Sequence, residues 1–212
     1  MDSAVVIGAG PGIGRAVAAR FAKEGLPVAV IARRTETVEG VAATLPGRTL
    51  ALTADVADEA RLRAALDRAA AELGPPAVVV HNAAIIRADA VGELSAAALL
   101  DTLAVNVASV LTAAAHILPG MAERGRGTFV VTGGMPAPVP GYVSLSIGKA
   151  AVRTAVDLLD ATYGPAGVHV ASVTVGGPVA PGTAYDPDDI AEHYWALHTQ
   201  PRADWVREVR HG

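Results

Sequence analysis

The residues with the clearest chemical use form a glycine cluster directly after the first apolar run, Ala4–Ile7. Apolar residues then recur every four positions at Ile13, Val17 and Phe21, which predicts a helix with one apolar face. Glycines leave room for a ligand and permit positive φ, and the free N–H groups of a helix's first turn attract anions such as a pyrophosphate. The residues expected to form this anion site are Gly8, Gly10, Pro11, Gly12, Ile13 and Gly14.

Further apolar runs alternate with helical patterns along the chain. Apolar runs without alternation are typical of strands buried on both faces of a parallel sheet. Strands that alternate with helices predict a doubly wound α/β fold in three layers, with helices on both faces. No repeat or linker divides the chain, so we expect one domain over residues 1–212. After the first strand and helix, strands are expected at 27–32, 49–54, 77–80, 128–132 and 168–173, and the longer helices at 95–117 and 146–163.

Composition limits the kind of protein that this chain can be. Hydrophobic residues make up 51% of it, enough for a sizeable core, and we find no apolar run long enough to span a bilayer. The absence of cysteine excludes disulfides and thiolate metal sites and fits a reducing cytoplasm. No basic leader is visible, and a formal net charge of −4 argues against a nucleic-acid surface. We therefore expect a cytoplasmic protein that binds neither membranes nor nucleic acids, and we assign no metal ligands.

Ligands of a doubly wound sheet bind beyond the carboxyl ends of its strands, so the residues after each strand are the most informative. Arg33 and Arg34 follow the second strand, at a distance from Gly14 where an acidic residue would bind an adenosine ribose. Two arginines pair instead with a ribose phosphate, which favours NADP(H) over NAD(H). The alternative is a solvated basic loop.

Two more polar residues end predicted strands. Asp55 would accept a hydrogen bond from an adenine amino group or cap the following helix. Asn82 would bridge neighbouring strand ends through its side-chain amide or form a local turn. The residues alone leave both pairs of alternatives open.

Five motifs, spread over about residues 3 to 182, occur in the order in which one enzyme family has them. Together they resemble the short-chain dehydrogenases/reductases. The resemblance implies a Rossmann-type domain, a nicotinamide dinucleotide, and hydride transfer to or from a carbonyl or an alcohol. The motifs are Gly8-x-x-x-Gly12-x-Gly14, Asp55, Asn82–Ala83–Ala84, Asn106 and Lys149–Ala150–Ala151.

The resemblance also implies roles for individual residues. Asn106 would anchor a water molecule and the active lysine, and Lys149 would bind the nicotinamide ribose and lower the pKa of a neighbouring tyrosine. The loop after the sixth strand resembles the segment that seats the nicotinamide carboxamide, with Val179 in backbone contact and Thr183 near the phosphates. The cofactor-binding set is completed by Val56, Ala83, Ala84 and Gly177.

Two catalytic groups of the family are missing from the chain. The family's tyrosine lies four residues before its lysine, where this chain has Leu145, and its serine follows the fifth strand, where this chain has Gly134. Leucine has no proton to give, so an ordinary ketone reduction lacks its acid. Thr132 is the nearest hydroxyl to the serine position, but it comes one or two residues early.

Other residues are candidates to replace the missing acid. Tyr142 lies seven residues before Lys149, so we name it with Asn106 and Lys149 as a candidate catalytic residue; a tyrosine that only packs at the rim is the alternative. Ser144 is either such a candidate or the N-cap of the following helix. His81 is either a proton shuttle or a strand-end histidine beneath the cofactor.

Two classes of function fit these residues. The first is an NADP(H)-dependent oxidoreductase with a non-standard active site, because a cationic imine takes a hydride at carbon without a proton donor. The second is a non-redox enzyme of the cyclase, isomerase or dehydratase type, or an inactive cofactor-binding protein, because a fold does not fix a function.

The expected partners are a small-molecule substrate and a second copy of the chain. After the sixth strand the sequence has room for one helix, which Asp186 would cap, instead of the pair of lid helices common in the family. We therefore expect a substrate site that is open or closed by a partner subunit. The alanine-rich helices expected at 95–117 and 146–163 resemble those that pair subunits in this family, which predicts a homodimer or homotetramer.

Overall fold

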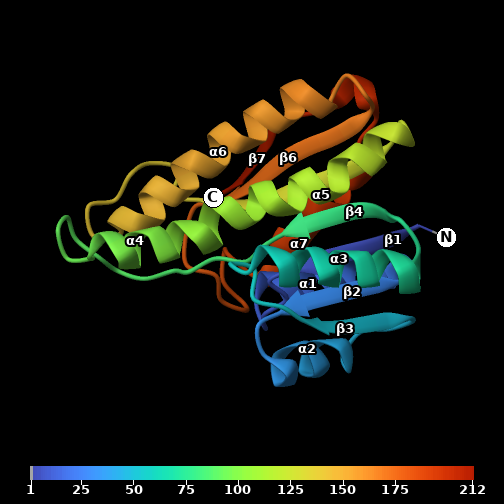
Figure 1. The fold of residues 1–212 in the computed structure, drawn as a ribbon, viewed down its shortest axis with the longest axis horizontal. Coiled ribbons are helices and arrows are strands. Elements are labelled where there is room, and N and C mark those ends of the chain that lie inside the picture. Colours follow the sequence, from blue (N-terminus) through green and yellow to red (C-terminus); the bar gives the residue numbers. More distant parts are fainter. Residues whose placement is uncertain (1) are drawn as a thin grey trace.

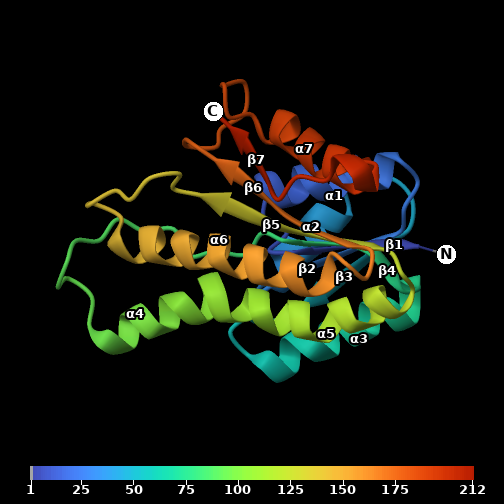
Figure 2. The same cartoon turned by 90° about the horizontal axis from the view of Figure 1, so that it is seen from above.

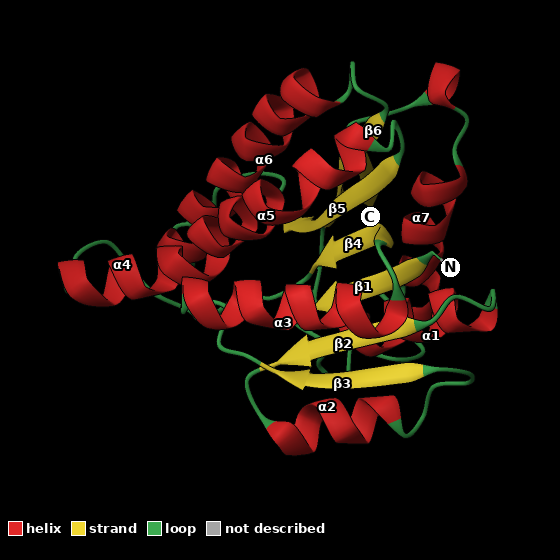
Figure 3. Ribbon diagram, turned by 45° about the vertical axis from the view of Figure 1, so that its right-hand side comes forward, coloured by secondary structure: helices red, strands yellow, loops and turns green. Residues whose placement is uncertain are grey.

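A seven-stranded parallel sheet forms the centre of the computed structural model, which describes residues 2–212 (Figure 3). The strand order is β3-β2-β1-β4-β5-β6-β7, so the chain winds outward in both directions from β1 and β4. Met1, the first residue of the domain expected over residues 1–212, lies outside the described part. The strands are β1 (Ser3–Ile7), β2 (Val28–Ala32), β3 (Thr49–Thr53), β4 (Pro76–His81), β5 (Gly127–Gly134), β6 (Val168–Val175) and β7 (Glu208–His211).

Helices cover both faces of the sheet (Figures 1 and 2), which confirms the predicted three-layer, doubly wound α/β fold. One layer holds α1 (Ile13–Lys23), α2 (Thr35–Ala42) and α7 (Pro187–Thr199). The other holds α3 (Glu59–Leu73), α4 (Ala96–Leu103), α5 (Ser109–Glu123) and α6 (Val143–Tyr163). A π-helical turn, η1 (Ala104–Ala108), joins α4 to α5, and a short 3-10 helix, η2 (Arg202–Asp204), precedes β7.

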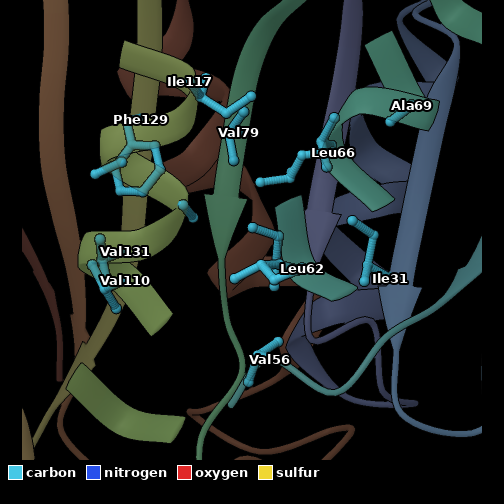
Figure 4. Close-up of a cluster of buried hydrophobic side chains, with 14 of the residues drawn as sticks. Ile31, Val56, Leu62, Leu66, Ala69, Val79, Val110, Ile117, Phe129 and Val131 are labelled. Atoms are coloured by element: carbon cyan, nitrogen blue, oxygen red, sulfur yellow. The ribbon is translucent and has the colours of Figure 1, made fainter. Parts of the chain in front are cut away.

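Two hydrophobic clusters, one on each face, hold the layers together. Strand residues alternate between them: Ala4 and Val6 of β1 face α1 and α7, whereas Val5 and Ile7 face α3 and α5. Figure 4 shows part of the cluster that contains Val5 and Ile7, in which side chains of α3 and α5 meet those of the sheet. Every residue of β1 is buried, and after Ser3 the strand is a continuous apolar run, Ala4–Ile7.

Several element bounds differ from those predicted. The predicted helix 95–117 begins after its cap, Ser95, continues to Glu123 and is interrupted by η1. The predicted helix 146–163 begins three residues earlier, at Val143. Neither α2 nor β7 was predicted. Helix α2 has eight residues, of which only Val38 and Val41 are buried, and β7 is a four-residue edge strand, so both have weak patterns.

The helical run Ala96–Glu123 corrects one expectation about membranes. Its length and its mean hydropathy of 1.6 would allow it to cross a bilayer by composition alone, although no such run was expected. Within the fold, Val110, Ala114 and Leu118 of this run pack against the sheet, but only 28% of its most apolar window is buried. Much apolar helix surface therefore faces outward.

Candidate active site

Two glycines of the first turn are required by the packing of the chain itself. Gly8 has a φ of +86°, and a Cβ on it would overlap the backbone of Ala83 after β4. A Cβ on Gly14 would overlap the carbonyl oxygen of Gly8, where α1 crosses the turn. These two residues therefore fix the shape of the turn between β1 and α1.

Gly10 and Gly12 have a different explanation. A Cβ on either would meet no atom within 4 Å, and neither has a positive φ, so no contact within the described residues requires glycine there. The N–H groups of Gly12, Ile13 and Gly14 make no hydrogen bond to another described residue, and they lie at the N-terminus of α1. Open space beside free N–H groups at the start of a helix is the geometry that a pyrophosphate site requires.

Arg33 and Arg34 lie at the next strand end, between β2 and α2. Both side chains are exposed, and within residues 2–212 neither makes a hydrogen bond or an ion pair through its guanidinium group. Arg34 is the N-cap residue of α2, so the N-terminus of a second helix adds free N–H groups beside them. This arrangement can bind a phosphate group.

The predicted residues after β3 and β4 lie at the same edge of the sheet as the glycine turn. Asp55 Oδ1 accepts a hydrogen bond from Ala57 N at 3.0 Å, so the Asp55 side chain forms a local turn. The cap of α3 is Asp58, so the predicted alternative in which Asp55 caps that helix is wrong. Val56 is buried in the core beside it. Asn82 bridges strand ends, as one alternative predicted: its Nδ2 donates to the Gly8 carbonyl oxygen at 2.8 Å.

Ala83 and Ala84 follow Asn82 and complete this side of the turn. Ala83 packs against the core, and its backbone lies where a Cβ on Gly8 would be. Ala84 is partly exposed. The three motif residues after β4 therefore lie beside the glycine turn, the place that a dinucleotide-binding role requires.

Lys149 lies on α6 with only 8% of its surface exposed. Its Nζ donates to the Thr132 carbonyl oxygen at 2.6 Å, and no carboxylate of the described chain lies within ion-pair distance. Burial without a counter-ion lowers the pKa of Lys149 from 10.5 to about 8. The amine can therefore exchange a proton near neutral pH.

Asn106 lies in the π-helical turn η1, and its side-chain amide pairs with the backbone of Ile85. Oδ1 accepts from Ile85 N at 2.7 Å, and Nδ2 donates to Ile85 O at 3.0 Å. A Cβ on Gly148 would lie 3.2 Å from Asn106 Cβ, so η1 and α6 approach closely one residue before Lys149. A π-helical turn at a candidate site is typical of functional positions.

Gly134 and Leu145 are the two positions where the resemblance predicts hydroxyl groups. A Cβ on Gly134 would lie 3.6 Å from Lys149 Cε, an ordinary contact, whereas one on Gly133 would overlap the Thr174 side chain. Gly134 is therefore the position with room for a serine. Leu145 lies one helical turn before Lys149 and is 4% exposed.

The serine and tyrosine at the start of α6 lie at some distance from the lysine. Tyr142 is the N-cap residue, so it precedes Lys149 by two helical turns, about 10 Å along the axis. Ser144 is not the cap, which corrects one prediction. Its N–H and Oγ both donate to the buried carboxylate of Asp89, at 3.0 Å in each case. Asp89 thus supplies the anion that this helix N-terminus favours.

The position of His81 bears on the two roles predicted for it. It is the last residue of β4, fully buried, with Nε2 2.8 Å from Ser109 Oγ. Burial, and secondarily the Lys149 charge, lower the pKa of His81 to about 3, so its ring stays neutral at physiological pH. The burial of His81 and its contact with Ser109 favour the strand-end histidine over the proton shuttle.

The loop between β6 and α7 carries the remaining predicted residues. Gly177 is required there because a Cβ on it would overlap the ring of Tyr185. Val179 is 38% exposed. The Thr183 hydroxyl donates to the Ala180 carbonyl oxygen at 2.8 Å, so it is used within its own loop. Asp186 caps α7, as predicted, and the lid region contains no further helix among the described residues.

Two positioning residues were missed. Arg153, one turn after Lys149 on α6, donates to the carbonyl oxygens of Gly134 and Met135 at 3.2 and 3.1 Å and so fixes the end of β5. Its four-residue spacing from Lys149 is a signal that could have found it. Asp89 contacts Ser144 across 55 residues of sequence, and no local pattern announces that contact.

The chain is similar in sequence to known dehydrogenases. The family profile described as short chain dehydrogenase matches residues 2–188. A D-threitol dehydrogenase from Mycolicibacterium smegmatis is 32% identical over 176 residues, which cover 81% of this chain and 68% of that protein. A cis-4-hydroxycyclohexanecarboxylate dehydrogenase from Sinomonas cyclohexanicum is 34% identical over 193 residues, which cover 88% of this chain and 77% of the relative.

Solved structures share the fold. A metagenomic short-chain oxidoreductase in complex with NADP has a TM-score of 0.90 and 24% identity, covering 100% of this chain and 97% of the other. An alcohol dehydrogenase from the archaeon Thermococcus sibiricus, complexed with 5-hydroxy-NADP, has a TM-score of 0.88 and 24% identity, with 99% and 95% covered. The chain belongs to the short-chain dehydrogenase/reductase family.

Proposed function

We propose that this protein is an NADP(H)-dependent oxidoreductase with a non-standard active site. The observation that carries the proposal is the combination of an open glycine turn, free N–H groups on α1 and two unpaired, exposed arginines after β2. The turn would hold the pyrophosphate, and Arg33 and Arg34 would hold a ribose phosphate. Solved neighbours with the same fold contain NADP or its 5-hydroxy derivative, which is consistent with this choice.

The substrate of such a site is an electrophile that is already activated. A bound nicotinamide would supply a hydride, and a ketone that accepts it develops an alkoxide that needs an acid. Leu145 and Gly134 offer no acid or hydroxyl. A protonated imine becomes a neutral amine when it accepts the hydride, so it needs no acid. We therefore propose a small imine or a similarly activated compound as the substrate.

The chain's own polar groups would then bind and orient. Lys149 would hold the nicotinamide ribose, Asn106 would support the approach of η1 to α6, and Val179 would offer backbone groups to the carboxamide. Tyr142 stays a candidate acid for substrates that need one. The absence of cysteine fits a reducing compartment, and we propose the cytoplasm.

Nucleotide titration tests the cofactor. NADPH should bind more tightly than NADH, because only NADPH carries the phosphate that the arginines can pair with. Arg33→Asp should reverse this preference if Arg33 contacts that phosphate. Arg48→Asp is the matched control, since Arg48 is also exposed but donates to the Glu72 carbonyl oxygen at the opposite ends of the strands. Equal or tighter binding of NADH by the wild type would contradict the proposal.

A substrate panel separates the proposed reaction from its alternative. NADPH oxidation by cyclic imines, without oxidation by simple ketones, is the expected result. Tight NADPH binding without oxidation by any imine or ketone would instead support a non-redox enzyme or a cofactor-binding protein on the same fold.

A further inference from the structure

The Thr132 hydroxyl connects the end of β4 to α7 at the candidate site. Its hydroxyl is nearly buried, with Oγ1 2.9 Å from Asn82 Oδ1 and 2.7 Å from the hydroxyl of Tyr194 on α7. A carbonyl oxygen only accepts hydrogen bonds, so the Thr132 hydroxyl must donate to Asn82. Its oxygen then accepts the hydrogen of Tyr194. The only hydrogen of this hydroxyl is therefore donated within the chain, so Thr132 does not replace the missing serine as a hydrogen-bond donor.

The chain of hydrogen bonds continues from Asn82 to the glycine turn. Asn82 Nδ2 donates to the carbonyl oxygen of Gly8 at 2.8 Å, which also fixes which end of the amide faces Thr132. The same carbonyl oxygen accepts from Gly10 N at 2.9 Å, and it lies where a Cβ on Gly14 would be. A shift of this carbonyl would therefore change both the turn and the start of α1.

Tyr194 cannot act on a substrate directly. It is fully buried between α7 and the sheet, in the cluster that contains α1. Burial raises the pKa of the Tyr194 hydroxyl above its usual value, so the group remains a hydrogen-bond donor throughout the physiological range. Leaving such a buried donor or acceptor without a partner is costly, so each member of the series constrains the next.

We infer that Tyr194 is a positioning residue whose hydroxyl, acting through Thr132 and Asn82, holds the Gly8 carbonyl and thereby the turn that binds the dinucleotide. The inference rests on the proposed function for its consequence in cofactor binding. The geometry itself does not depend on the cofactor, because all three hydrogen bonds join residues of the chain.

Tyr194→Phe removes only the hydroxyl and keeps the buried ring. In the cofactor-free protein, backbone amides of residues 8–14 should exchange faster with deuterium, because the Gly8 carbonyl is held less firmly. The dissociation constant for NADPH, measured well below the unfolding temperature, should rise between about twofold and tenfold, the effect of one hydrogen bond. A residue with a purely structural role would lower the unfolding temperature without moving either quantity.

Thr128→Val is the matched control. Thr128 lies four residues before Thr132 on the same face of β5, and its Oγ1 is 2.9 Å from Nδ1 of His198, also on α7. The variant removes a hydrogen bond between the same strand and the same helix, at the end of the sheet remote from the glycine turn. Thermal stability should fall to a similar extent, while exchange in residues 8–14 and NADPH affinity stay at wild-type values.

Substitutions at the centre of the series complete the test. Thr132→Val should reproduce the effects of Tyr194→Phe, and Thr132→Ser should retain wild-type exchange and affinity because it keeps the hydroxyl. The double variant Thr132→Val with Tyr194→Phe should cost less affinity than the two single effects combined. Unchanged exchange and affinity in Tyr194→Phe would overturn the inference. A wild type that binds no dinucleotide would overturn the proposed function, and the exchange comparison would still decide the role of Tyr194.

Discussion

Lys149 donates a hydrogen bond from Nζ to the backbone carbonyl oxygen of Thr132, 2.6 Å away, and this bond joins α6 to the end of β5. No acidic side chain of residues 2–212 lies within ion-pair distance of the amine. Its charge is therefore supported by a single carbonyl dipole in a buried place, which is costly. A buried charge that destabilises the fold, at a strand end where ligands bind, is typical of a functional group.

The free-energy cost of burying the Lys149 charge should appear in the pH dependence of stability. Burial lowers the pKa of Lys149 from 10.5 to about 8. Between these values the unfolded chain binds more protons than the folded protein, so the contribution of Lys149 to stability rises with pH. Below about pH 8 the lysine is charged in both states, and its full burial cost remains. Relative to Lys149→Met, the wild type should gain about 3 kcal/mol of unfolding free energy from pH 7.5 to pH 10.5.

Urea titrations at several pH values measure this difference. Lys23→Met is the control, because Lys23 is the only other lysine and its side chain is exposed. The unfolding free energies of that variant and of the wild type should run in parallel across the same range. Parallel curves for Lys149→Met as well would show that the amine is hydrated and not buried.

Two glycine substitutions should separate folding from binding. Gly8→Ala should unfold the protein or lower its stability strongly, because the new Cβ overlaps the Ala83 backbone at a φ of +86°. Gly10→Ala should fold normally, because its Cβ meets nothing within 4 Å, yet NADPH affinity should fall by more than about tenfold as the methyl group enters the phosphate site.

Gly40→Ala is the control for this pair. Gly40 lies in α2, also with open space around its missing Cβ, so alanine there should keep or raise stability and leave NADPH affinity unchanged. Circular dichroism and fluorescence titration report the two properties separately. Wild-type affinity in Gly10→Ala would show that the open turn is not the phosphate site.

The sequence predicts the fold well where one local pattern decides it. Glycines after a buried strand predict the first turn, and the four-residue spacing of Ile13, Val17 and Phe21 predicts α1, because the helix buries that stripe against the sheet. Helix α2 and strand β7 escape such reasoning, since each buries few side chains and lies at an edge of the sheet.

For the candidate site, the sequence predicts which residues take part better than it predicts their polar contacts. Lys149 and Asn106 are predicted from motif spacing. The contacts of Asn106 with Ile85 and Gly148, which are distant in sequence, are not predicted, and neither is the π-helical turn that carries Asn106. The same holds for Asp89, which meets Ser144 only after the sheet has formed. Side-chain hydrogen bonds across 20 to 60 residues leave no periodic signal in the sequence.

Tyr142→Phe tests the remaining candidate acid. Tyr142 lies two helical turns before Lys149, and within the described chain its hydroxyl makes no hydrogen bond. We therefore expect kcat for an imine to change by less than about twofold, since a positioned acid is worth about 10²–10⁴ in rate and this phenol is remote. A loss of a hundredfold, with NADPH affinity unchanged, would establish Tyr142 as the acid.

A homo-oligomer should form through the outward faces of α4, α5 and α6. Leu100 lies on α4 and Leu111 on α5, on either side of η1. Ile147 and Leu158 are eleven residues apart on α6, so they lie on one face of that helix at an interval of three turns. These four apolar side chains are between 45% and 65% exposed. Together they give α4, α5 and α6 an apolar surface that a second copy can cover.

Light scattering measures the association. The wild type should give at least twice the 21.4 kDa mass of one chain at micromolar concentration, and Leu111→Glu with Leu158→Glu should give a monomer. Val206→Glu is the control, because Val206 is 41% exposed but lies outside these helices, before β7. A monomeric wild type would contradict the prediction.

The history of the site can be tested by putting the missing hydroxyl groups back. Gly134 has room for a serine side chain, since its Cβ would lie 3.6 Å from Lys149 Cε. Leu145 is 4% exposed, so a tyrosine there must displace its neighbours, at a cost of about 1–3 kcal/mol in stability. Lys149 remains in place to lower the pKa of the new phenol.

In a decayed ketoreductase, Leu145→Tyr with Gly134→Ser would restore a positioned acid and raise ketone reduction by about 10²–10⁴. We expect the other outcome. Leu145 is closely packed and the surrounding lysine, asparagine and glycine turn are intact, which fits a site reshaped for another reaction. The double variant should then lose imine-dependent NADPH oxidation and gain none with ketones. Gly134→Ser alone is the matched control, because it fits the space available and should keep wild-type stability. A gain above about a hundredfold with a simple ketone would show that the site is a ketoreductase that has lost its acid.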